Sequence, residues 1–138
     1  MRNAEKTIGN LIDKQKTALI GSINEDGYPN IKAMLAPRVR EGIRIFYFTT
    51  NTPSIRVKQY FNNPKACIYF CDNRFFRGVQ LIGTMEVLED NQSRELVWRD
   101  GDTLYYKGIH DPEYCVLRFT AEKGRYYHSF KSEDFMVE

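Results

Sequence analysis

The sequence predicts a mainly β protein: a small closed or nearly closed β-barrel with a few helices, built as one domain over residues 1–138. A hydrophobic content of 42% and an aromatic content of 14% fit a chain of this length with a full, strand-rich core. Six or seven short apolar segments are separated by turn residues, which is typical of antiparallel strands. Helical patterns occur only singly between them, and this argues against a doubly wound parallel sheet.

The first part of the chain is expected to form a helix and a hairpin. Apolar residues at helical spacing predict an amphipathic helix over residues 4–14. Asp26-Gly27 can adopt the positive φ of a tight turn, so residues 17–24 and 30–37 read as two paired strands. Pro37 cannot donate a hydrogen bond to a neighbouring strand and is expected to mark the end or the edge of the second one.

The middle of the chain predicts three strands and one helix. Residues 44–50 read as a buried strand, and the helix that follows begins near Ser54 and stops before Pro64. Strands are expected at residues 65–71 and 78–88. Gly83, inside the second of these, indicates a bulge or a close approach of another backbone.

The last third predicts a helix over residues 89–99, an irregular segment over 101–112 and two closing strands. These strands cover residues 114–120 and 124–130, joined by a turn at Ala121-Glu-Lys-Gly124.

Charge and cysteine content limit the classes of function. The net charge of +2 is too small and too evenly distributed for a nucleic-acid binder, and no apolar run approaches the roughly 20 residues that span a membrane. The start of the chain lacks the apolar region of a signal peptide, so we expect a cytoplasmic protein. Cys67, Cys71 and Cys115 are expected to be reduced and buried, because a metal site would need more ligands than His110 and His128 supply.

One stretch has the composition of an anion site. Thr49 and Thr50 end a strand, Ser54 opens a helix, and Arg56 and Lys58 lie in its first turns. The amides at a helix N-terminus favour an anion, and hydroxyl and guanidinium groups can add hydrogen bonds to a phosphate.

Lys32 can add a further cation to this anion site, and the same residues also have a simpler interpretation. Lys32 lies mid-strand, where it can reach an anion held by the neighbouring strand. Alternatively, Ser54 is an ordinary N-cap and Arg56 and Lys58 are solvated. Spacing alone favours the alternative.

The sequence resembles the pyridoxamine 5'-phosphate oxidase-like flavoproteins, whose fold is an FMN-binding split barrel. No single motif is specific, but their order and spacing together are. The matching segments are Asp26-Gly-Tyr-Pro29 with the strand to Leu35, Phe46-Tyr-Phe-Thr-Thr50 with Ser54-Ile-Arg56, Asn63-Pro64, Gly83, and Asp111 to Thr120.

The resemblance implies a set of FMN-binding residues. The phosphate-contacting cation of the family falls on Lys32, and Arg56 stands where the family often has a lysine. A glutamine that reaches the ring in the oxidases falls on Gly78, so this contact is missing or supplied by Gln80. The implied cofactor-binding residues are Lys32, Ala33, Met34, Leu35, Thr49, Thr50, Ser54, Arg56 and Gln80.

The resemblance also implies a homodimer with the flavin at its interface, and an FMN-dependent oxidoreductase acting on a small substrate. The C-terminal arm that closes over substrate in the true oxidases is lacking, and no side chain is assigned a catalytic role. Two alternatives are a non-catalytic flavin-binding or stress-related protein, and a relative that binds haem or a deazaflavin. His128 is either a contact to such a ligand or, as is more common for a lone histidine, a packing residue.

Overall fold

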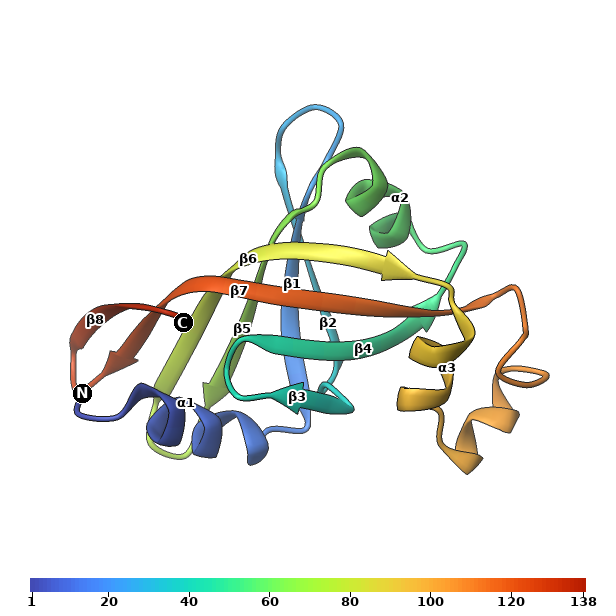
Figure 1. Cartoon of the computed structure of the whole chain (residues 1–138). Coiled ribbons are helices and arrows are strands. Elements are labelled where there is room, and N and C mark those ends of the chain that lie inside the picture. The colour runs from blue at the N-terminus through green and yellow to red at the C-terminus, as the bar shows by residue number, and fades with distance from the viewer.

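The computed structural model describes residues 1–138, except for the side chain of Arg56. Its strands form one antiparallel sheet in the order β2-β1-β5-β6-β7-β4-β3 (Figure 1). The last strand, β8, pairs with the second half of β7, beyond the part that pairs with β4. The strands are β1 (Thr17–Ile23), β2 (Pro29–Leu35), β3 (Val39–Glu41), β4 (Ile45–Asn51), β5 (Lys65–Asp72), β6 (Arg77–Leu88), β7 (Tyr114–His128) and β8 (Lys131–Met136). The helices are α1 (Ala4–Asp13), α2 (Ile55–Asn62), α3 (Asn91–Val97) and the 3-10 helix η1 (Asp100–Leu104). The predicted mainly β fold with a few helices is confirmed.

The sheet curls around one main core. Ile20 of β1 and Phe46 of β4 stand far apart in the strand order, yet both belong to the same buried cluster, together with Ile8 of α1. In Figure 1, β1 and β2 run steeply across β4, β6 and β7. Among the described residues, the edge strands β2 and β3 do not pair with each other, so the barrel is nearly closed rather than closed.

β7 corrects the predicted end of the chain, since it is one strand of 15 residues and not two strands joined by a turn. Ile82 of β6 pairs with Lys123 and the next residue, Gly83, pairs with Ala121, so Glu122 is the extra residue of a β-bulge. The polar residues that resemble a turn are therefore this bulge. The chain reverses later, at Ser129 and Phe130, which have φ values of 49° and 62°.

A second cluster packs at the far end of β4 and β7, and it joins the predicted helix, observed as α3, to the segment that was expected to be irregular. Trp98 and Tyr106 contact the ring of Tyr114 edge-on, both at 5.1 Å between centroids. Arg94 is buried and donates to the backbone oxygens of Ile109 and Asp111. This cluster holds α3 and η1 against the sheet. The short strand β3 was also not predicted.

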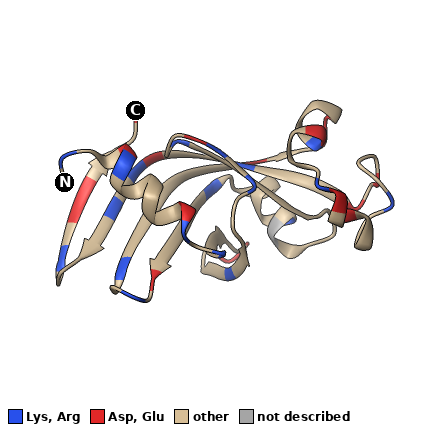
Figure 2. Ribbon diagram, turned by 90° about the horizontal axis from the view of Figure 1, so that it is seen from below, with Lys and Arg blue, Asp and Glu red and all other residues tan. Residues whose placement is uncertain are grey.

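Charge is distributed along the whole molecule. Figure 2 shows Lys and Arg interspersed with Asp and Glu from one end of the ribbon to the other. Several of these charges are paired across strands, for example Arg118 with Glu86 and Arg125 with Asp134. None of the described helices is long and apolar enough to cross a membrane.

Candidate functional site

A groove follows β2 and contains most of the residues that the sequence singles out. Its first part, about 230 Å³, lies between the second half of β2 and the end of β4. Lys32, Ala33, Met34 and Leu35 line it from β2, and Thr49 and Thr50 line it from β4.

Successive side chains of β2 point to opposite faces of the sheet, so only some of them point into this part of the groove. Lys32 pairs with Ile20 and Met34 pairs with Ala18, and both partners are buried in the core. Lys32 and Met34 therefore point to the core side, at its open edge, whereas Leu35 points away and is 76% exposed. This part of the groove therefore has the apolar Met34 side chain, the Lys32 cation at one end, and Thr49 and Thr50 opposite.

The second part of the groove adjoins the first through Lys32. It measures about 320 Å³ and brings Lys32 together with Asn51 and Ser54. The Ser54 Oγ accepts a hydrogen bond from the amide of Val57 at 3.3 Å, so Ser54 is the N-cap of α2. Its hydroxyl hydrogen can still be donated to a ligand. The capping role and the ligand role, which are alternatives on sequence spacing alone, are thus compatible at Ser54.

One of the sequence-derived residues, Gln80, stands apart from this groove. Gln80 lies in a separate hollow of about 270 Å³ with Gly21 and Cys67, on the other face of the sheet. Burial raises the pKa of the Cys67 thiol, which Gln80 also contacts. The side chain of Arg56 lies outside the described part of the structure, so its predicted contact with a phosphate stays a prediction.

Arg38 is a groove residue that the sequence analysis missed. It lines the first part of the groove, and both of its Nη atoms donate to the carboxylate of Asp102, with Nη2 at 2.7 Å from Oδ1. The guanidinium holds the pKa of Asp102 below its usual value. No local pattern could have indicated this pair, because its members are 64 residues apart.

The outer face of β2, β1 and β5 is unusually apolar for a surface. Leu19, Ile31 and Leu35 point outward there, with exposed fractions of 42%, 68% and 76%. Gly21 and Cys67 lie beside them, at the hollow that also contains Gln80. We refer to the surface formed by these five residues as the outer face. A face of this kind is a candidate contact for another molecule.

His128 contacts other side chains of the same sheet. Its Nε2 lies 3.1 Å from Oε2 of Glu133, and its ring stacks on Tyr126 with a centroid separation of 4.5 Å. Nearby, exposed Phe75, Phe76 and Phe130 form a hollow of about 400 Å³. The contacts of the histidine favour the packing interpretation.

Comparisons with known proteins agree with this fold. The family model described as Pyridoxamine 5'-phosphate oxidase matches residues 4–128. A Clostridium acetobutylicum protein related to general stress protein 26, of the pyridoxinephosphate oxidase family, is 41% identical with a TM-score of 0.87, and the match covers 97% of this chain and 94% of that one. No match is found among the curated proteins.

More distant structures share the fold alone. A NimC/NimA family protein from C. acetobutylicum is 21% identical with a TM-score of 0.78, over 98% of this chain and 94% of that chain. A heme binding protein from Mycobacterium smegmatis is 11% identical with a TM-score of 0.79, over 99% of this chain and 59% of the other.

Proposed function

The chain belongs to the pyridoxamine 5'-phosphate oxidase family, and on this premise we propose that it binds FMN in the groove along β2 and acts as an oxidoreductase on a small substrate. One observation carries the proposal: the fold gathers Lys32 to Leu35, Thr49, Thr50 and Ser54, which are dispersed in the sequence, along one groove. Bound FMN would supply the redox chemistry, and the protein would supply binding and orientation.

The character of the groove fits the two ends of FMN. Lys32 and Ser54 share the part next to the start of α2, where a cation, a hydroxyl and helix amides favour a phosphate. The side chain of Met34 and the backbone of Ala33 and Leu35 suit a flat ring, and Thr49 and Thr50 can hydrogen-bond to its polar edge.

We further propose that two copies of the chain associate through the outer face. Leu19, Ile31 and Leu35 present apolar surface next to the groove, and Leu35 belongs to both. Association there would cover the open side of the bound flavin. It would also bring Gln80, which lies beside the outer face, closer to a flavin of the partner subunit. The three free cysteines suit the reducing conditions of the cytoplasm, where we place the protein.

Haem is the main rival cofactor, because one of the similar folds is that of a heme binding protein. The lining of the groove favours flavin instead, since its described residues offer a cation and hydroxyls for a phosphate and include no histidine to bind haem iron. An absorption spectrum of the purified protein after incubation with FMN or haemin tests this directly. We expect flavin bands that stay with the protein through gel filtration. A Soret band with no retained flavin would reject the FMN proposal.

The phosphate assignment is tested by Lys32→Met and Ser54→Ala. A hydrogen bond to a charged group contributes about 1.5–3 kcal/mol, so the Lys32 variant should bind FMN roughly 10- to 150-fold more weakly. Riboflavin, which lacks the phosphate, should be bound equally by the variant and the parent. Quenching of flavin fluorescence measures both affinities. Lys6→Met, on the exposed side of α1, is the matched control, and equal FMN affinity in all variants would contradict the assignment.

Turnover separates an enzyme from a carrier. The FMN-loaded protein should oxidise reduced nicotinamide in the presence of a nitroaromatic or quinone acceptor, at a rate above that of free FMN. A rate equal to that of free FMN with every acceptor would support a flavin carrier.

A further inference from the structure

Two neighbouring turns at one end of the sheet carry three exposed phenylalanines. The turn at residues 73–76 joins β5 to β6, and the turn at residues 129–130 joins β7 to β8. They lie side by side, because Gly78 of β6 pairs with Tyr127 of β7, and both turns line one hollow of about 400 Å³. Figure 2 shows both strand pairs projecting from the end of the molecule where the termini lie, with Lys or Arg at each. We refer to these turns as the two tips.

The phenylalanines of the two tips are exposed, although the turns themselves do not require large apolar side chains. Phe75 is 60% exposed, Phe76 is 86% exposed and Phe130 is fully exposed. Phe76 and Phe130 also have φ values of 52° and 62°, in the left-handed region that favours glycine. Within the described chain, every non-glycine residue with a positive φ belongs to the two tips. Glycine would build both turns with less strain and no apolar surface, so these rings point to a contact outside the chain.

Unpaired cations accompany the rings. Within the described residues, exposed Arg74 and Lys131 form no ion pair. The carboxylates of the same strand ends are paired inside the chain, since Asp72 contacts Arg77 and Glu133 contacts the N-terminal amine. The two tips therefore present apolar rings together with uncompensated positive charge.

This combination matches the surface of an anionic membrane. Apolar rings enter the boundary between lipid headgroups and acyl chains, and Lys and Arg contact the anionic headgroups. A pocket for a small ligand would bury the rings, and a second copy placed tip to tip would bring like charges together. We propose that the two tips dock the protein reversibly on an anionic lipid surface, with Phe76 and Phe130 inserted. This docking goes beyond the proposed function and does not require bound flavin.

The test is sedimentation of the full-length protein with lipid vesicles. One set consists of phosphatidylcholine alone, and the other is a mixture of phosphatidylcholine and anionic phosphatidylglycerol. The protein should bind the mixture roughly tenfold or more tightly than phosphatidylcholine alone, and added salt should weaken this binding. Failure to sediment with the mixture, or equal binding to both sets, overturns the proposal.

Insertion of a tip is measured by quenching of tryptophan fluorescence with brominated lipid. The parent chain has one tryptophan, Trp98, which packs on Tyr114 in the second cluster, away from the two tips. Vesicle-bound parent should therefore keep its fluorescence, whereas the added tryptophan of Phe130→Trp should be quenched. An unquenched Phe130→Trp protein on the vesicles would contradict insertion.

A glycine variant removes the rings without disturbing the turns. Phe76→Gly combined with Phe130→Gly suits both φ values, so the midpoint of urea unfolding should stay near that of the parent. Affinity for the mixed vesicles should fall at least about tenfold. Phe61→Ala, which removes a 65% exposed ring from α2, is the matched control and should bind as the parent does. Unchanged vesicle binding by the glycine variant overturns the proposal, and so does a smaller mass in light scattering, which would assign the two tips to a contact between copies.

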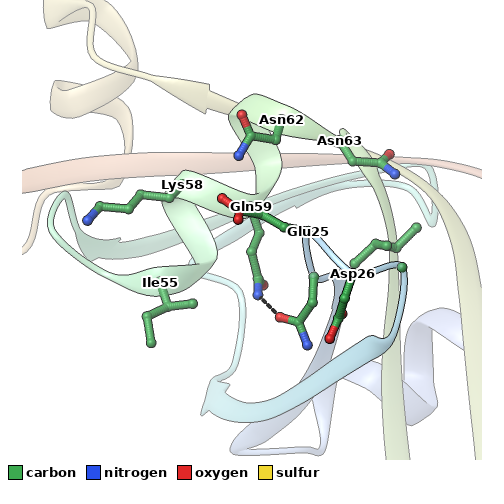
Figure 3. A pocket seen from close by; sticks show the side chains of 10 residues that line it. Glu25, Asp26, Ile55, Lys58, Gln59, Asn62 and Asn63 are labelled. Carbon is green, nitrogen blue, oxygen red and sulfur yellow. Dashed lines mark hydrogen bonds between the residues drawn. The ribbon is translucent and has the colours of Figure 1, made fainter.

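A second pair of variants tests the cations. Arg74→Gln combined with Lys131→Gln should weaken binding to the mixed vesicles roughly fivefold for each lost charge, and should reduce its dependence on salt. The matched control is Lys14→Gln combined with Lys58→Gln, which removes two exposed lysines elsewhere, the second of them on α2 (Figure 3). Equal losses in the two double variants would show a response to net charge alone and would overturn the role of the two tips.

Discussion

At the scale of single residues, Gly83 of β6 lies directly against the backbone of β7. A Cβ placed on it would lie 1.9 Å from the backbone oxygen of Thr120, which no real contact allows. The neighbour is backbone of the bulged strand, so it cannot turn aside as a side chain would.

Gly83→Ala should therefore lower the free energy of unfolding by about 3 kcal/mol or more, at the upper end of overpacking effects. The midpoint of urea unfolding measures this. Gly101→Ala is the matched control, because a Cβ there meets no atom within 4 Å, and it should change stability little. Equal midpoints for the two variants would show that β6 and β7 can separate at the bulge.

The Arg38–Asp102 pair gives the fold a dependence on acid. The pKa of Asp102 is lower in the folded chain than its ordinary value, chiefly through the hydrogen bonds from Arg38. The pair therefore contributes fully above the unfolded pKa of about 4, and this contribution disappears as pH falls through the lower folded value.

Asp102→Asn tests this contribution. The carboxylate is nearly buried, with 6% of its side chain exposed, so breaking the pair should cost on the order of 3 kcal/mol at neutral pH. The difference from the parent should shrink as pH falls below about 4. Asp13→Asn breaks the ion pair between Asp13 and Arg40. The side chain of Asp13 is 56% exposed, so this change should lower the free energy of unfolding by less than about 1 kcal/mol. A pH-independent difference for Asp102→Asn would contradict the ionic origin.

At the scale of elements, α2 is held in place by a small polar network. Gln59 is buried and connects the helix to Ser22 and Asn24 of the hairpin. Because Ser54 begins the same helix, the network also fixes the start of α2 beside the groove.

Gln59→Ala should leave Ser22 and Asn24 without these partners and cost about 1–3 kcal/mol. It should also weaken FMN binding without touching the flavin. Gln92→Ala, at an exposed position of α3, is the control for both measurements. Unchanged FMN affinity in a destabilised Gln59→Ala protein would separate the network from the binding groove.

Local chemistry explains which elements the sequence could predict. The Asp26-Gly27 turn was predictable because Gly27 adopts a φ of 85°, and the start of α2 because Ser54 caps it. The turn expected at residues 121–124 was wrong, since a bulge and a turn use the same polar and small residues. Only the pairing partner, β6, distinguishes the two.

Some of the residues that line the groove could be named from the sequence, and others only from the structure. Ala33 to Leu35 were assigned through the family resemblance, and Thr49, Thr50 and Ser54 first from local composition. Both groups line the groove, and their role in binding FMN stays a prediction. Their meeting in one groove depends on β2 and β4 lying close together across the opening of the barrel, which the strand order alone does not reveal. Arg38 required knowledge of a partner in η1, far along the chain.

At the scale of the whole molecule, the outer face should control association. Leu19→Glu places a charge in the centre of this face and should yield a monomer where the parent is a dimer. Size-exclusion chromatography with light scattering measures the mass. Leu104→Glu, at a leucine that is 82% exposed on η1, should leave the mass unchanged. A parent protein that is already monomeric at micromolar concentration would exclude the proposed dimer.

The length of β7 also bears on how the chain folds as it is made. β7 pairs with β4, β6 and β8, so the barrel cannot assemble until this strand has left the ribosome. At ordinary rates of synthesis, the stretch from Asn51 to His128 takes on the order of ten seconds. During that interval, β4 has only the short strand β3 as a partner, and its other edge is unpaired. The nascent chain is therefore most prone to aggregate just before its last strands are complete, and a slowed ribosome would lengthen that period.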